Sequence, residues 1–174
     1  MRNIEIRQEK TSDYTQVFSL NRNAFGQDNE AKLVDALRSS GNFIPELSLV
    51  ALLNGEIVGH ILFTKIVIRS DTGNTYESLS LAPMAVYRSF QKKGIGSRLV
   101  KAGLRKATEL GYTSVIVLGH ENYYPRFGFK PASRWDIKAP YDVPDNVCMA
   151  LELVRNSLDG VNGTVEYPDE FESV

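Results

Sequence analysis

An apolar segment that leads into a basic, glycine-rich turn and then a helical pattern constrains this chain most. The segment from Leu79 to Tyr87 has strand character, and a helix is expected from about Gly94 onward. The turn between them reads Gln91-Lys92-Lys93-Gly94-Ile95-Gly96. The first amides of a helix lack internal partners, and the helix dipole favours negative charge there. Because glycine also lets a ligand approach the backbone closely, this arrangement predicts a site for a phosphate-bearing anion.

Two common phosphate-binding motifs fit this turn poorly. A P-loop requires a Lys-Ser/Thr pair after its last glycine, whereas Ser97-Arg98 follows Gly96. The dinucleotide fingerprint requires a third glycine, and Leu99 occupies that position. A protein that binds ATP or NAD through this turn is therefore the least favoured hypothesis.

A second motif follows the next expected strand. Thr113–Leu118 is an apolar, β-branched run, and Tyr124-Pro125-Arg126-Phe127-Gly128-Phe129 comes soon after it. The order of strand, Gln-x-x-Gly-x-Gly turn, helix, strand and Tyr-x-x-x-Gly-Phe resembles the GNAT acyltransferases, which bind acetyl-coenzyme A (acetyl-CoA). The longer sequence around both motifs resembles the YhbS-like branch of N-acetyltransferases, and the resemblance covers most of the chain.

The resemblance implies a mixed α/β (α+β) GNAT fold, with a mostly antiparallel central sheet that is splayed in the middle and flanked by helices. Residues 1–174 are expected to form a single N-acetyltransferase domain. Apolar periodicity predicts helices from Tyr14 and Asn29 and a third one from Gly94 to Gly111. Strands are expected over 47–53, 56–68, 75–87, 113–118 and 147–154, a long loop over 131–144 and a frayed tail over 169–174.

Pro83 lies inside the apolar strand and cannot donate a ladder hydrogen bond. Pairing is expected to break there through a bulge or splay, which would leave the amides and carbonyls of Met84, Ala85 and Val86 without strand partners. The amide-bearing pantetheine arm could pair with this opened edge, as it does in GNAT enzymes. An ordinary edge strand is the alternative.

The resemblance also implies roles for individual residues. The backbone of Met84, Ala85 and Val86 would hold the pantetheine arm, and the Val86 N–H would stabilise the oxyanion. The residues expected to hold the pyrophosphate are Gln91, Lys92, Lys93, Gly94, Ile95, Gly96 and Ser97. Tyr124 stands four residues before Gly128, like the family tyrosine, and is expected to contact the cofactor and protonate the leaving thiolate.

The roles of several other polar and aromatic side chains stay open between alternatives. Tyr123 competes with Tyr124 for the acid role and is otherwise a packing residue. Asn122 could hydrogen-bond the pantetheine arm or cap the short helix. The general base stays open between Glu77, His60 and a water chain, although a histidine in an apolar strand is more often a hydrogen-bonded core residue. His120 is equally well explained as a loop residue.

The composition of the chain argues against some classes of binding partner. The formal net charge is -1, which gives no basic field for nucleic acid or a membrane surface. No apolar run approaches the ~20 residues of a membrane helix. The single cysteine, Cys148, excludes an internal disulfide and suits a cytoplasmic protein; its apolar neighbours predict a buried strand position.

The expected activity is therefore transfer of an acetyl group from acetyl-CoA, as co-substrate and without a metal, to a primary amine by direct attack. The N-terminal helices and the 131–144 loop show no dense acidic patch, so a small amine or amino-acid-like acceptor is favoured over a polycation. A protein N-terminus or lysine is the next acceptor class. A non-catalytic acyl-CoA-sensing module is the alternative function, and the resemblance allows a homodimer.

Overall fold

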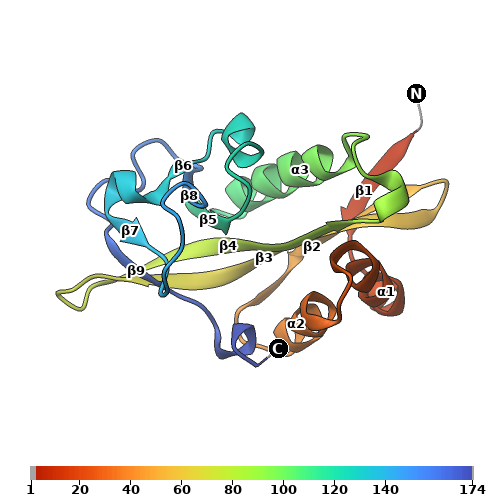
Figure 1. The fold of residues 1–174 in the computed structure, drawn as a ribbon, viewed down its shortest axis with the longest axis horizontal. Coiled ribbons are helices and arrows are strands. Elements are labelled where there is room, and N and C mark those ends of the chain that lie inside the picture. Colours follow the sequence, from red (N-terminus) through yellow and green to blue (C-terminus); the bar gives the residue numbers. More distant parts are fainter. Residues whose placement is uncertain (1–2, 174) are drawn as a thin grey trace. The chain divides into compact units, whose positions relative to one another are not determined.

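The computed structural model describes residues 3–173, and Figure 1 labels its helices and strands. The α-helices are α1 (Tyr14–Phe25), α2 (Asn29–Arg38) and α3 (Ile95–Glu109). The strands are β1 (Ile4–Gln8), β2 (Phe43–Leu53), β3 (Glu56–Arg69), β4 (Thr75–Val86), β5 (Ser114–Leu118), β6 (Lys130–Pro131), β7 (Ile137–Lys138), β8 (Cys148–Glu152) and β9 (Gly163–Glu166). Short 3-10 helices are η1 (Thr11–Asp13), η2 (Arg88–Phe90), η3 (Tyr124–Phe127), η4 (Ala132–Trp135) and η5 (Asp169–Phe171).

The strands belong to one mixed sheet in the order β1-β2-β3-β4-β5-β8-β6, and β9 pairs with β3 and β7. Pairing is antiparallel between β1 and β2, β2 and β3, β3 and β9, β5 and β8, and β6 and β8. It is parallel between β4 and β5 and between β7 and β9. The predicted mixed, mainly antiparallel sheet with flanking helices is therefore confirmed.

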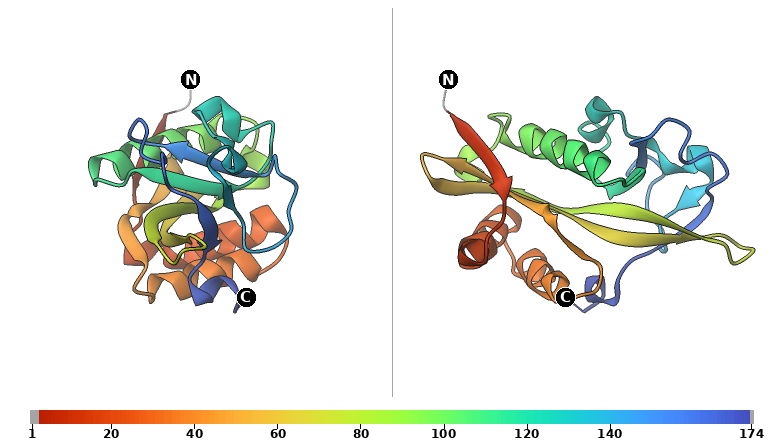
Figure 2. Two further views of the ribbon diagram at one scale, coloured as in Figure 1. Left: turned by 90° about the vertical axis from the view of Figure 1, so that its left-hand side faces the viewer. Right: turned by 180° about the vertical axis from the view of Figure 1, so that it is seen from behind.

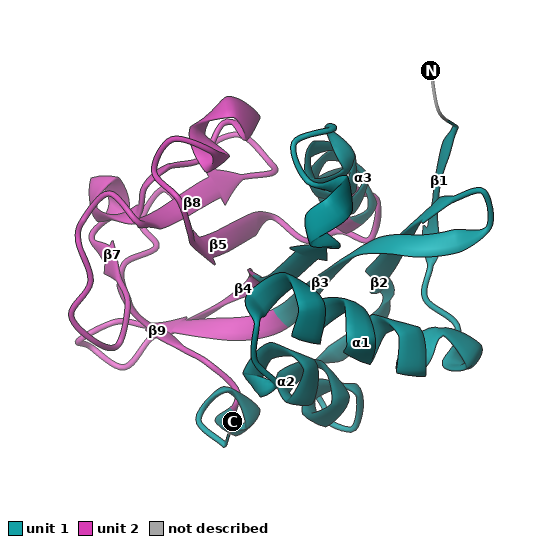
Figure 3. Cartoon of the chain, turned by 45° about the vertical axis from the view of Figure 1, so that its right-hand side comes forward, with its two compact units in different colours: residues 1–64, 82–106, 169–174 teal, residues 65–81, 107–168 magenta. Residues whose placement is uncertain are grey.

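The chain divides into two compact units, one made of residues 1–64, 82–106 and 169–174 and the other of residues 65–81 and 107–168 (Figure 3). Strands β3 and β4 each contribute residues to both units. Within the described part of the chain, no helix has the length and apolar character needed to cross a membrane.

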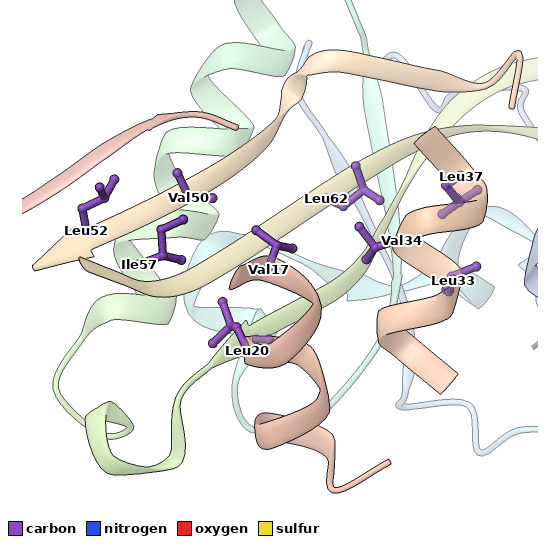
Figure 4. Close-up of a cluster of buried hydrophobic side chains, with 10 residues drawn as sticks. Val17, Leu20, Leu33, Val34, Leu37, Val50, Leu52, Ile57 and Leu62 are labelled. Atoms are coloured by element: carbon purple, nitrogen blue, oxygen red, sulfur yellow. The ribbon is translucent and has the colours of Figure 1, made fainter. Parts of the chain in front are cut away.

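In the first unit, α1 and α2 lie on one face of β2 and β3, and Figure 2 shows α3 on the opposite face. Figure 4 shows how apolar side chains of the two N-terminal helices point toward those of the strands. The helical members of this buried cluster recur at three- and four-residue spacing, which places them on one side of each helix. The labelled members are Val17, Leu20, Leu33, Val34, Leu37, Val50, Leu52, Ile57 and Leu62.

On the other face of the first unit, α3 approaches β3 at a glycine. A Cβ atom on Gly103 would lie 2.2 Å from Cε1 and 2.7 Å from Cζ of Phe63. The Phe63 side chain is fully buried, so the ring has little room to move away. The missing side chain at Gly103 therefore sets how closely the helix packs on the strand.

Replacing Gly103 with alanine is expected to destabilise the protein by about 1–2 kcal/mol, because overpacking against Phe63 outweighs the better helix propensity of alanine. Urea unfolding measures this difference. Gly41→Ala is the matched control, since a Cβ at Gly41 meets no atom within 4 Å. Its effect should stay within about 0.5 kcal/mol. A Gly103→Ala protein as stable as the parent would contradict this account of the packing.

The second unit has its own buried cluster, built from the second half of β3 together with β5, β7, β8 and β9. Its fully buried members include Ile68, Ile116, Ile137, Ala150 and Val165. Cys148, the first residue of β8, is also buried in this cluster, as predicted.

Three predicted segments differ from the structure. Strand β2 begins at Phe43 rather than Leu47; its register shifts between Phe43 and Ser48, and Pro45 in this stretch obscures the strand pattern. The 131–144 segment contains η4 and β7 rather than only loop. The fraying predicted for the tail is wrong for η5, because Phe171 packs against the cluster formed by α1, α2, β2 and β3. Val174 lies outside the described residues.

Candidate functional site

The end of the predicted strand, the turn and most of the helix form one continuous segment in the first unit. β4 ends at Val86, and α3 begins at Ile95. The Gln91 side-chain amide donates to the Val86 carbonyl oxygen at 3.0 Å, which ties the turn back to the strand end. The Tyr87 N–H donates to the Val58 carbonyl at 3.0 Å, so the strand end is also held to β3. The predicted residues from 84 to 97 thus lie on one connected strand end, turn and helix start.

The turn before α3 exposes positive charge and backbone. Lys92 and Gly94 adopt left-handed conformations, with φ of 63° and 83°. For Gly94 this backbone explains the residue type, because glycine adopts it without strain. Lys92, Lys93 and Gly94 are exposed, whereas Ile95 is buried and anchors the start of the helix. Exposed lysines beside the first turn of a 15-residue helix favour an anionic ligand.

The other predicted cofactor residues of this segment vary in burial. Met84 is half-buried and Ala85 and Val86 are buried, which suits a role carried by the backbone rather than by side chains. Gln91 is exposed, and Gly96 and Ser97 are half-buried.

Gly59 of β3 also shapes this segment, although the sequence analysis missed it. A Cβ at Gly59 would lie 2.9 Å from Cδ1 of Leu99, 3.2 Å from Cγ2 of Ile95 and 3.4 Å from the Ala85 carbonyl oxygen. The first turn of α3 and the end of β4 therefore pack directly against this glycine. The available signal was a glycine inside an otherwise apolar strand, which often marks a close approach.

The interruption of strand pairing expected at Pro83 stays a prediction. Strand conformation continues through this buried proline to Val86, and the Ala82–Pro83 peptide bond is cis. β4 pairs with β5 through Leu79 with Val115 and Ser80 with Ile116, both before the proline. Free amides at the end of β4 remain a prediction.

Tyr124 belongs to the second unit and is held from several sides. Its side chain is 8% exposed, and its ring lies against Gly119, where a Cβ would come within 2.2 Å of Cε2. The Phe129 ring centroid lies 5.6 Å away in an edge-on arrangement. Burial raises the pKa of Tyr124 to about 12, so the phenol is protonated at neutral pH and is a weaker acid than a free tyrosine.

The neighbours of Tyr124 have structural contacts. The guanidinium of Arg126 lies 4.5 Å from the centroid of the Tyr123 ring, and its Nε donates to the Tyr123 carbonyl oxygen at 3.0 Å. Asn122 is exposed, and its backbone N–H donates to Nδ1 of His120 at 3.1 Å. Tyr123 is the N-cap of η3 and has no side-chain cap bond, so the capping role considered for Asn122 is wrong.

The candidate bases lie in different environments. His60 is fully buried, and its Nε2 lies 2.9 Å from Oγ of Ser48. Burial and then the charge of Arg38 lower the pKa of His60 to about 3, so it is a weak base. The prediction of a hydrogen-bonded core histidine is confirmed. Glu77 and His120 are both exposed.

The segment after η3, which was considered as a wall for the acceptor, lines a pocket in the second unit. The pocket has a volume of about 480 Å³. Its lining residues are Ser133, Ile137, Lys138, Ala139, Pro140, Tyr141, Asp142, Val143, Pro144, Asp145, Cys148 and Thr164. Carboxylates, an ammonium group and an aromatic ring therefore surround a space large enough for a small polar molecule.

The chain resembles known proteins over nearly its whole length. A model of the Acetyltransferase (GNAT) family matches residues 13–129. The uncharacterized N-acetyltransferase YjhQ of Escherichia coli (strain K12) is 38% identical over 165 residues, which cover 93% of this chain and 91% of that protein.

Solved structures match as well. The crystal structure of the GNAT family N-acetyltransferase YhbS from Escherichia coli, in complex with CoA, has a TM-score of 0.90 and 31% identity, over 99% of this chain and 93% of that chain. A GNAT family acetyltransferase from Brucella melitensis, in complex with acetyl-CoA, has a TM-score of 0.79 and 28% identity, over 98% of this chain and 99% of that chain. The resemblance inferred from the two motifs and the predicted fold class are confirmed.

Proposed function

Because the chain belongs to the GNAT acetyltransferase family, we propose that it moves an acetyl group from acetyl-CoA directly to a primary amine of a small, amino-acid-like acceptor. The chain is an acetyl-CoA-dependent N-acetyltransferase, and acetyl-CoA is its co-substrate. Beyond this activity, we propose the class of the acceptor, the direct attack of the amine on the thioester and the roles of individual residues. We also propose that residues 1–174 act as one catalytic domain.

The observation that carries the proposal is the strand–turn–helix segment that ends β4 and begins α3. Its exposed lysines and left-handed Gly94, next to the first turn of α3, suit a diphosphate, and two similar proteins are solved with CoA or acetyl-CoA. On this proposal, Gln91 to Ser97 hold the pyrophosphate, and the backbone of Met84 to Val86 pairs with the pantetheine arm. Asn122 would contact the same arm.

Direct attack needs no covalent enzyme intermediate. Cys148 is the chain's only cysteine; it is buried, and burial raises the pKa of its thiol, which opposes a nucleophilic role. An alkyl amine with a pKa of ~10.4 is mostly protonated at neutral pH, and the ammonium form has no free electron pair. The amine must therefore lose a proton before it attacks the thioester. Attack forms the C–N bond, and collapse of the tetrahedral intermediate breaks the C–S bond.

Two groups would assist the formation and the breakdown of the tetrahedral intermediate. The Val86 N–H would donate to the oxyanion, and Tyr124 would protonate the departing thiolate. Tyr124 is protonated at neutral pH, as this role requires, although burial, which raises its pKa to about 12, makes it a weaker acid than a free tyrosine. For the proton lost by the amine, water or exposed Glu77 is favoured over His60, whose pKa is lowered to about 3.

The acceptor class rests on the pocket lined by Ser133, residues 137–145, Cys148 and Thr164. At about 480 Å³ it fits a small molecule, and its lining offers both carboxylates and an ammonium group. Such a mixture matches the paired charges of an amino-acid-like amine. A protein N-terminus or lysine is the competing acceptor and is one outcome of the test below.

Release of free CoA thiol from acetyl-CoA, followed over a panel of amino acids, small amines and peptides, tests the proposal. Tyr124→Phe should lower kcat by about 100-fold or more, as expected for loss of a general acid. Tyr123→Phe is the matched control and should retain most of the activity. Tight acetyl-CoA binding without thiol release for any amine, and without an effect of Tyr124→Phe, would instead identify a non-catalytic sensor.

A further inference from the structure

We propose that His120 is a positioning residue for Tyr124, acting through the turn that leads into η3. This inference rests on the acid role proposed for Tyr124, because only that role makes the position of the ring important for turnover. The function assigned to the chain so far does not use His120, for which the sequence favours neither a base nor a loop residue.

His120 binds the backbone amides of three successive residues. Its carbonyl oxygen accepts from the N–H of Tyr123 at 3.0 Å and from that of Tyr124 at 3.4 Å. Its ring nitrogen Nδ1 accepts from the N–H of Asn122 at 3.1 Å. The backbone from 122 to 124 is therefore wrapped around one residue, and the side chain of His120 supplies the first of the three contacts.

The Nδ1 contact determines the chemical form of the imidazole. A backbone N–H can only donate, so Nδ1 must be the unprotonated acceptor and the proton of the neutral ring lies on Nε2. The spacing, from a side chain to the N–H two residues later, is that of an Asx turn. An asparagine at position 120 could accept the same hydrogen bond through its side-chain oxygen, whereas leucine could not.

The residue before His120 fixes the other end of the turn. The Gly119 N–H donates to the Val147 carbonyl oxygen at 2.9 Å, which ties the turn to the residue preceding β8. The ring of Tyr124 folds back against Gly119, with no side chain between them. The ring thus lies on an anchored residue at one end and depends on the His120 turn at the other, so loosening the turn should displace it.

The experiment compares His120→Leu with His120→Asn in the thiol-release assay. His120→Leu should lower kcat about five-fold, the effect of losing one ordinary hydrogen bond, and leave the KM for acetyl-CoA unchanged. His120→Asn should stay within about two-fold of the parent because it keeps the acceptor. In a Tyr124→Phe background, His120→Leu should have no further effect on kcat. Equal losses in the leucine and asparagine variants, or a loss that persists without the Tyr124 hydroxyl, would overturn the inference.

A second readout does not depend on turnover. In protein labelled with ¹³C-tyrosine, the ring resonance of Tyr124, assigned with Tyr124→Phe, should shift in His120→Leu and stay in place in His120→Asn. An unshifted resonance in His120→Leu overturns the positioning role. If the parent protein releases no thiol with any amine, the proposed function fails, and this spectrum still decides whether His120 positions the ring.

Discussion

Replacing Arg38 with methionine is expected to lower the free energy of unfolding by about 3–5 kcal/mol, because it leaves a buried carboxylate without its cation. Nη2 of Arg38 lies 2.6 Å from Oε2 of Glu9, and Nε lies 3.1 Å from Oε1. The exposed fractions of the two side chains are only 7% and 2%. Few water molecules can therefore solvate the carboxylate once the guanidinium is gone.

The remaining neighbours of Glu9 cannot replace the lost charge. Ser48 donates its only hydroxyl proton to Oε1 of Glu9 at 3.0 Å, so His60 must be the donor in the 2.9 Å contact between its Nε2 and Ser48 Oγ. His60 is neutral at pH 7, because burial and then the charge of Arg38 lower its pKa to about 3. At neutral pH, Arg38 is thus the cation that compensates Glu9 in this hydrogen-bonded network.

Urea unfolding at pH 7 measures the effect, and a second substitution tests the cause. Arg38→Met combined with Glu9→Gln should recover much of the loss, because the uncompensated charge is then removed as well. Arg22→Met is the matched control: Nε of Arg22 also lies 2.6 Å from an oxygen of Asp28, but the side chains are 57% and 40% exposed. It should change stability little. Equal effects of Arg38→Met and Arg22→Met would refute the role of burial.

The elements that the sequence predicted well are those whose signals are local. The helices α1 and α2 follow from apolar spacing, and the end of α1 follows from Gly26, whose φ of 70° gives a left-handed C-cap. The candidate cofactor segment is continuous in sequence from 84 to 97, so its order of strand, turn and helix could be predicted without knowing any distant contact.

What the sequence could not reveal depends on partners far apart in the chain. Glu9 and Arg38 are 29 residues apart, and Ser48 lies 39 residues from Glu9. No periodicity joins such positions, so a buried ionic network in the first unit was not expected. Likewise, Gly59 and Gly119 have no local pattern that identifies Leu99 or Tyr124 as the side chain occupying the space of the missing Cβ.

Gly96→Glu is expected to weaken acetyl-CoA binding by about 100-fold or more, because it places a carboxylate where we propose that the diphosphate binds. Gly96 is the second residue of α3, so a larger side chain is compatible with its helical backbone. An acidic residue in the first turn also interacts favourably with the helix dipole, and the fold should remain at least as stable. Loss of affinity without loss of stability would therefore point to the ligand rather than to unfolding.

Calorimetric titration with acetyl-CoA and urea unfolding measure the two quantities separately. Gly96→Gln is the matched control for size, and the excess loss in Gly96→Glu reports the charge alone. Acetyl-pantetheine, which lacks the diphosphate, adds a second control: its kcat/KM should fall much less in Gly96→Glu than that of acetyl-CoA. If glutamate and glutamine weakened acetyl-CoA binding equally, or if both donors lost the same factor, the first turn of α3 would not be the diphosphate site. The proposed roles of Gln91 to Ser97 would then be wrong, since those residues surround this turn.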